Sequence, residues 1–343
     1  MPESLAGMTP AELARLVAFL TGLRRKPGRD VPRGLQESTT NEADCVVDVY
    51  APAHSVWPAP ERGTGARRSR CTPLVMALHG LNMDAGRDDR LVRFARALAR
   101  SGVTCLVPTI PALADARLAA SDLDVLERLI LATATRVPIP LCVTGFSVGA
   151  AYGLRVASRE SVRLHVGAVV AFGAYYDLAA LLDHLAQTFP GGEAAPSDGS
   201  IYAALVLARM CGDRLAPGLV PRVVEMLRGY CSRPLEEKQA FFRAHLASQP
   251  LAEAFRAVRG DSDWAALSPK GHLARLAVPV SLVHDRSDAL VPIDHAVAAA
   301  AELAGSPDLR VWITNALDHV DYAGIRPRDV RAMLRALMLL VRG

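Results

Sequence analysis

The feature that most constrains this sequence is a series of short apolar segments that alternate with helical patterns from residue 74 onward. The apolar segments lie at 74–78, 103–107, 141–144 and about 164–172, and the helical segments near 88–101, 121–136 and 148–159. Short apolar strands that alternate with helices are typical of a parallel sheet covered on both faces. The alternation returns with a strand at 278–283, a helix near 293–304, a strand at 309–314 and a helix at about 327–341. We therefore predict an α/β fold with a mostly parallel sheet.

Residues 178–275 interrupt this alternation. They contain helical segments and no good strand, and a loop rich in proline, glycine and serine divides them at 190–200. We interpret 178–275 as an inserted helical cap. The α/β core is then expected at 44–177 and 276–343, and an N-terminal helix and linker at 1–43.

The N-terminal helix is expected near residues 9–25. Thr9 and Glu12 have the spacing of a capping box, in which each side chain bonds the main-chain N–H of the other. The predicted apolar stripe consists of Leu13, Leu16, Val17 and Leu20, and the basic cluster Arg24, Arg25 and Lys26 follows it. Two roles stay open, packing on the main domain, which we favour, and contact with a membrane surface.

Composition and charge exclude several classes of protein. A chain of 343 residues that is 51% hydrophobic can fill one large core. Its net charge of +4 is spread along the chain, which argues against a nucleic-acid partner. Five arginines near 88–101 form a stripe that we assign to the solvent face of that helix, because apolar side chains occupy the other side: Arg87, Arg90, Arg93, Arg96 and Arg100.

Cysteine spacing and hydropathy bear on cofactors and location. The six cysteines form no C-x-x-C pair and no H-E-x-x-H motif occurs, so we expect reduced thiols, no metal and no cofactor. No run of 18 uncharged apolar residues is present, and the N-terminal basic cluster follows the apolar run instead of preceding it. The sequence therefore predicts a soluble, cytoplasmic protein without an integral membrane segment.

Residues 145–149 read Gly-Phe-Ser-Val-Gly, a G-x-S-x-G motif between an apolar strand and a helix. In a strand-to-helix turn of this kind a serine is held on a strained backbone, and the flanking Gly145 and Gly149 avoid collisions with the neighbouring strand and helix. The alternative is an ordinary turn with a capping serine. The position of the motif in the parallel series favours Ser147 as a nucleophile.

A serine nucleophile needs a base, and the base needs a carboxylate that orients it. Asp288 follows the strand at 278–283, and His319 follows the strand at 309–314. Loops at the carboxyl ends of parallel strands meet at one edge of the sheet. We therefore expect Ser147, Asp288 and His319 to form a catalytic triad.

Other candidates for the acid have simpler interpretations. Asp285 is interpreted as a turn residue, and Asp177 as the N-cap of a helix that starts at Leu178. Four histidines outside any motif are interpreted as surface or cap residues: His184, His245, His272 and His295.

From about 44 to 341 these motifs resemble the α/β-hydrolase superfamily. The matching segments are His79-Gly80, an oxyanion-loop dipeptide, Gly145 to Gly149, and His284-x-x-x-Asp288-x-x-Val291-Pro292, an acid loop. The resemblance implies an oxyanion hole formed by the main-chain N–H groups of Leu81 and Val148. We interpret His79 itself as a structural residue that shapes the oxyanion loop through a hydrogen bond.

A serine triad implies acyl transfer through an acyl-enzyme. We expect hydrolysis of a small-molecule carboxylic ester of small or medium acyl chain. An acyltransferase, a thioesterase or peptidase on the same triad, and a noncatalytic small-ligand receptor stay open, as does the oligomeric state. Apolar residues of 178–275 that could line an acyl pocket, or form the core of the cap itself, are Leu181, Leu182, Ile201, Leu205, Met210, Phe241, Phe242 and Phe255.

Overall fold

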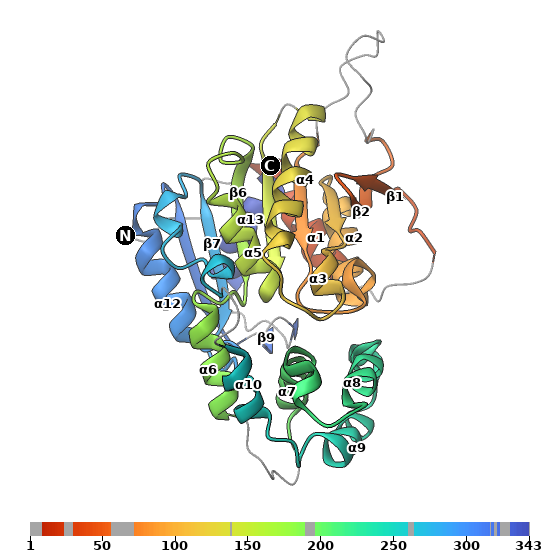
Figure 1. Ribbon diagram of the computed structural model, residues 1–343. Helices are drawn as coiled ribbons and strands as arrows, with labels where there is room; N and C mark the ends of the chain where they lie inside the picture. Colours follow the sequence, from red (N-terminus) through yellow and green to blue (C-terminus); the bar gives the residue numbers. More distant parts are fainter. Residues whose placement is uncertain are drawn as a thin grey trace.

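The computed structural model (Figure 1) describes residues 9–23, 30–55, 72–137, 139–188, 196–259, 264–315, 317–318, 321–322 and 330–342. Its centre is an eight-stranded sheet in the order β1-β2-β4-β3-β5-β6-β7-β8. The strands are β1 (Leu35–Glu42), β2 (Cys45–Pro52), β3 (Leu74–Leu78), β4 (Thr104–Pro108), β5 (Leu141–Phe146), β6 (Val166–Phe172), β7 (Val280–Asp285) and β8 (Leu309–Thr314). The strands from β4 to β8 are parallel, and β2 is antiparallel to both of its neighbours.

Helices cover both faces of the sheet, as the apolar strands require. One apolar cluster joins the sheet to α1 (Pro10–Leu23), α2 (Asp89–Arg100) and α13 (Val330–Arg342). A second cluster, on the other face, includes α4 (Ser121–Arg136), α5 (Val148–Ala157) and α12 (Ile293–Glu302). Successive residues of β3 alternate between the clusters, with Val75 and Ala77 in the first and Leu74, Met76 and Leu78 in the second.

The N-terminal helix packs on the core and makes contacts with α2 and α13. Thr9 and Glu12 form the predicted capping box, because each main-chain N–H donates to the side chain of the other. The buried face differs from the predicted stripe. Leu16 and Phe19 are fully buried, whereas Leu13 and Val17 are about half exposed. The basic cluster Arg24, Arg25 and Lys26 lies outside the described residues.

The interpretation of 1–43 as helix and linker misses strand β1. This strand has the sequence LQESTTNE, whose side chains are exposed or half-buried on both faces, so no apolar alternation marks it. It is held by antiparallel pairing with β2 along its whole length, from Leu35 opposite Pro52 to Glu42 opposite Cys45. The sheet therefore begins at Leu35 and not at about residue 44.

Strand β1 also changes the environment of the arginine stripe on α2. Arg96 is buried, and its guanidinium donates to both carboxylate oxygens of Glu37 on β1, at 2.6 and 3.0 Å. This hydrogen bond to Glu37 raises the pKa of Arg96. The expectation of a solvent-facing stripe is therefore wrong at Arg96, because β1 covers that part of α2.

Between β6 and β7 the chain forms helices, and no strand is assigned in the described parts of 178–275. These helices gather at one end of the sheet, in the lower part of Figure 1. They are α6 (Leu178–Thr188), α7 (Asp198–Cys211), α8 (Leu219–Leu227), α9 (Leu235–His245), α10 (Leu251–Arg259) and α11 (Trp264–Leu267).

Of the cysteines in the described residues, four are free thiols: Cys45, Cys105, Cys142 and Cys211. Cys231 is exposed, while Cys45, Cys105, Cys142 and Cys211 are buried. Burial raises the pKa of the Cys142 thiol to about 12, so it stays protonated at neutral pH. Within the described ranges, none of the helices combines the length and the apolar character that crossing a membrane demands.

Candidate active site

Ser147 occupies a sharp turn between β5 and α5. Its backbone has φ 53° and ψ −121°, a conformation that residues with a Cβ rarely adopt. Its N–H donates to the carbonyl of Phe172 at 2.8 Å, which fastens the turn to the end of β6. The side chain remains partly exposed. The turn therefore holds a serine at the carboxyl end of the central strand β5, where a ligand can reach it.

The two glycines of the motif allow this turn to pack. A Cβ placed on Gly145 would lie 2.5 Å from the carbonyl carbon of Gly149, and a Cβ on Gly149 would lie 2.2 Å from the carbonyl oxygen of His79. Both separations are far shorter than van der Waals contact, and both involve backbone atoms that cannot rotate away. The G-x-S-x-G spacing is thus dictated by the close approach of α5 to β5 and to the loop after β3.

The loop after β3 is fixed by His79, which is 2% exposed. The His79 Nε2 atom accepts the N–H of Ile110 at 2.9 Å. The proton therefore sits on Nδ1, which donates to the Gly80 carbonyl at 2.7 Å. Burial lowers the pKa of His79 to about 4, so the ring is neutral at physiological pH.

This loop passes directly against the serine. A Cβ on Gly80 would lie 3.5 Å from the Cβ of Ser147. The next residue, Leu81, and the residue after the serine, Val148, are both buried. Within the part of the chain that the structure describes, neither of their N–H groups donates to an acceptor. Val148 directly follows Ser147, and Leu81 directly follows the Gly80 that packs against it.

The loop that contains Asp288, the predicted acid, follows β7. The Asp288 side chain has no exposed surface, and its Oδ1 atom accepts the N–H groups of Leu290 and Val291, both at 2.9 Å. Its Oδ2 atom lies 3.8 Å from Nε2 of His284. Asp288 is therefore a buried carboxylate whose plane is set by its own loop.

The two alternative acids have the structural contacts expected of a turn residue and a helix cap. Asp285 is buried and accepts both the N–H and the O–H of Ser287, at 2.8 and 2.7 Å. Asp177 accepts the N–H groups of Ala179 and Ala180 at the start of α6, at 3.0 and 3.3 Å. Its other oxygen accepts Nζ of Lys270 at 2.8 Å.

The predicted base, His319, lies outside the described residues. Its neighbours in sequence form a small antiparallel pair, β9 (Leu317–Asp318) with β10 (Asp321–Tyr322), after the end of β8. Strand β8 is adjacent to β7, which carries the acid loop. Strand β9 contacts β7, so Leu317–Asp318 lie near the strand that precedes the loop of Asp288.

His295 was expected at the surface or at a cap, and the structure corrects this. It is 7% exposed, and its Nδ1 atom accepts the N–H groups of Tyr176 and Asp177, at 3.2 and 3.4 Å. Burial lowers its pKa, which agrees with an imidazole that accepts at Nδ1. No local sequence motif marks this role, because its partners lie more than one hundred residues earlier. Of the others, His184 lies 3.3 Å from the Ala289 carbonyl of the acid loop.

His295 on α12 bonds the segment that leads into the helical insertion. Glu302 on the same helix bonds the segment that leads out of it. Glu302 accepts the N–H groups of Gly271 and Leu273, at 2.9 and 2.7 Å, and the hydroxyl of Tyr176 at 2.7 Å. The N–H of Lys270 donates to the Tyr176 carbonyl at 3.0 Å, which joins the two connections to each other. The entry and exit of the insertion are therefore tied together and to the core.

Polar contacts also join the insertion to loops of the core. Gly229 donates its N–H to Oδ1 of Asp84 at 3.3 Å, three residues beyond Leu81. Arg209 on α7 makes an ion pair with Asp115 at 3.1 Å. The helices of the insertion are thus seated beside the loop that follows β3.

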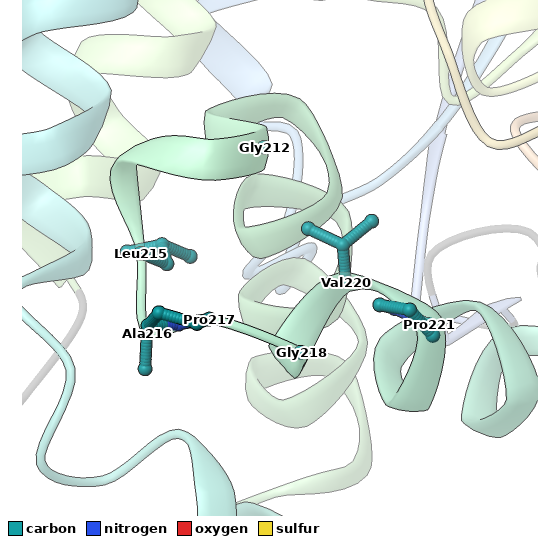
Figure 2. Close-up of a pocket in the computed structure, with 7 residues that line it drawn as sticks. All are labelled: Gly212, Leu215, Ala216, Pro217, Gly218, Val220 and Pro221. Carbon is teal, nitrogen blue, oxygen red and sulfur yellow. The ribbon is translucent and has the colours of Figure 1, made fainter.

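A hollow of about 360 Å³ lies elsewhere, at the turn from α7 to α8 (Figure 2). Its lining has no titratable side chain and none of the candidate catalytic residues: Gly212, Leu215, Ala216, Pro217, Gly218, Val220 and Pro221. Nor do the described residues contain a group of three or more His, Cys, Asp or Glu placed to hold a metal ion.

Comparison with solved structures identifies the fold. An esterase from Pyrococcus furiosus superposes with a TM-score of 0.50 at 15% identity, over 92% of this chain and 97% of its own. A serine hydrolase from Cycloclasticus zankles gives 0.47 at 12% identity, over 89% and 98%. A proline iminopeptidase from Mycobacterium smegmatis gives 0.47 at 14% identity, over 89% and 97%. No family model and no curated protein sequence matches. The chain has the α/β-hydrolase fold.

Proposed function

We propose that this protein is a serine hydrolase that cleaves carboxylic esters of small or medium acyl chain. The observation that carries the proposal is the backbone of Ser147, held at φ 53° between β5 and α5. Strain of this kind persists only where the surrounding structure enforces it, and it is concentrated at functional sites. A serine that merely capped α5 would need no such conformation, and no side-chain cap hydrogen bond is made by Ser147.

In the proposed reaction, Ser147 Oγ attacks the ester carbonyl while His319 takes its proton. The oxygen of the tetrahedral intermediate receives the N–H groups of Leu81 and Val148. His319 then protonates the leaving alcohol, and an acyl-enzyme remains. Water, activated by the same imidazole, hydrolyses it. Asp288 accepts the other N–H of His319 and stabilises the imidazolium.

We assign 178–275 to a cap on the core. The core consists of 44–177 and 276–343 together with strand β1, which the sequence had placed in the N-terminal linker. The cap is fastened at both connections through His295 and Glu302 on α12. A lid that opens at an oil surface needs freedom at such connections. A fastened cap instead favours a pocket of fixed size, and hence substrates of small or medium acyl chain.

Side-chain burial divides the apolar candidates of the cap. Leu181, Leu182, Ile201, Leu205 and Phe242 are buried within the apolar cluster that also contains the sheet, so we assign them to the packing of the cap. Met210 and Phe241 are only partly buried against that cluster and stay candidates for contact with an acyl chain. The side chain of Phe255 lies outside the described residues.

The proposal is tested by hydrolysis of p-nitrophenyl esters from acetate to palmitate, with Ser147→Ala as the control. We expect the highest kcat/KM at short or medium chains, a smooth dependence on concentration through the solubility limit, and no hydrolysis by the variant. A maximum at long chains with a jump above the solubility limit would contradict the fixed cap. Hydrolysis that survives in the variant would contradict the nucleophile.

A further inference from the structure

We infer that His284 is a positioning residue that fixes the acid loop and so orients Asp288. This inference rests on the proposed serine hydrolase function. His284 is the penultimate residue of β7 and is 1% exposed. Its Nε2 atom lies 2.7 Å from the carbonyl oxygen of Val291. A carbonyl only accepts, so Nε2 carries a proton and donates it to Val291.

Val291 is the residue that connects this histidine with the acid. Its N–H donates to Oδ1 of Asp288 and its carbonyl accepts from His284. Val291 is therefore bonded to the acid through its N–H and to His284 through its carbonyl. The N–H of Leu290 adds a second bond to the same carboxylate oxygen.

The consequence is a fixed orientation of the carboxylate. With Oδ1 held by two N–H groups of its own loop, the plane of the carboxylate is set, and Oδ2 faces the His284 side at 3.8 Å. That distance is too long for a hydrogen bond, so His284 acts on Asp288 through the loop. Without the bond to Val291, the turn from 288 to 291 can shift and take the carboxylate with it.

The contact does not depend on a charged imidazole, because a neutral ring with Nε2 protonated donates equally. Other titratable groups face this region. His295 on α12 has a pKa lowered chiefly by burial and further by the nearby His284 and His184. Asp285 follows His284 on β7 and is buried with its own turn contacts.

The test compares His284→Phe with His284→Gln on a short p-nitrophenyl ester. Phenylalanine fills the site without a donor, whereas glutamine carries an N–H that can reach Val291. We expect His284→Phe to lower kcat by about 10- to 100-fold with KM changed less than about 2-fold, since a misplaced acid costs less than a removed one. Glutamine should restore kcat to within about 5-fold of the wild type.

A pH profile distinguishes positioning from simple support of the fold. A displaced carboxylate stabilises the imidazolium of His319 less, so the acid limb of kcat/KM should move to lower pH in His284→Phe, by about 1 unit. The matched control is Val283→Ala, the preceding residue, buried in the apolar cluster on the opposite face of the sheet. It should lower the unfolding free energy and leave both kcat and the acid limb unchanged.

The inference is overturned if His284→Phe keeps kcat and the acid limb of the wild type, or if Val283→Ala moves both equally. Equal losses in His284→Gln and His284→Phe would also overturn it. Failure of the proposed function gives a different pattern, in which the wild-type chain itself hydrolyses no ester and Ser147 does not react with a fluorophosphonate.

Discussion

At the scale of single residues, the candidate site depends on two glycines where a side chain has no room, Gly145 and Gly149. Gly149 is the clearest case, because a Cβ there would lie 2.2 Å from the His79 carbonyl oxygen. We expect Gly149→Ala to lower the unfolding free energy by about 2–4 kcal/mol, since the clash is with backbone and not with a mobile side chain. Urea unfolding measures this. Gly305→Ala is the control, since its Cβ would meet nothing within 4 Å.

The proposed triad predicts non-additive losses of activity. Ser147→Ala and His319→Ala should each reduce kcat by about 10³-fold or more, and the double variant should be little worse than either alone, because the members act as a unit. Asp288→Asn should also be severe, whereas Asp177→Asn should change stability more than kcat. Independent, multiplicative losses of kcat for Ser147 and His319 would count against the triad. A loss of kcat in Asp177→Asn but not in Asp288→Asn would show that the acid is Asp177, after β6.

His79 gives a dependence of stability on pH whose sign can be stated. Its pKa falls from 6.5 in a free chain to about 4 in the folded protein, because burial disfavours the charged ring. Its contribution is therefore fully present above about pH 6.5 and is lost as the pH falls toward 4, by up to about 3 kcal/mol. Unfolding free energies from pH 4 to 8 should fall less steeply in His79→Asn than in the wild type. Parallel curves would refute this.

At the scale of elements, the apolar segments predicted the parallel strands closely. The polar contacts between residues distant in sequence could not be predicted. The strands at 74–78 and 309–314 and the helix at 121–136 have the predicted bounds. Strand β1 was missed because its polar side chains leave no periodicity, and its stability comes from pairing with β2. Ser147 and Asp288 follow β5 and β7, as their motifs indicated. The buried roles of Arg96 and His295 depend on partners distant in sequence and were not predictable.

The hydrogen bonds that tie the helical insertion to α12 predict the effect of a substitution at Glu302. Glu302→Ala removes the acceptor for the N–H groups of Gly271 and Leu273 and for the Tyr176 hydroxyl. We expect the unfolding free energy to drop by about 1–3 kcal/mol and proteolysis near 268–276 to accelerate. The preference of the enzyme should also move toward longer acyl chains as the cap loosens. Glu253→Ala on α10 serves as a comparison. An unchanged chain-length profile in Glu302→Ala would show that the contacts of α12 do not determine which acyl chains are accepted.

At the scale of the whole molecule, we propose that the α/β-hydrolase fold holds one reactive serine, Ser147, under a helical cap. The most direct measurement is mass spectrometry of the intact protein and its peptides after treatment with a fluorophosphonate. We predict a single adduct on the peptide that contains Ser147, formed with loss of fluoride, and none in Ser147→Ala although that variant remains folded. An unmodified Ser147 in the folded wild-type protein, or an adduct on another residue, would contradict the central claim.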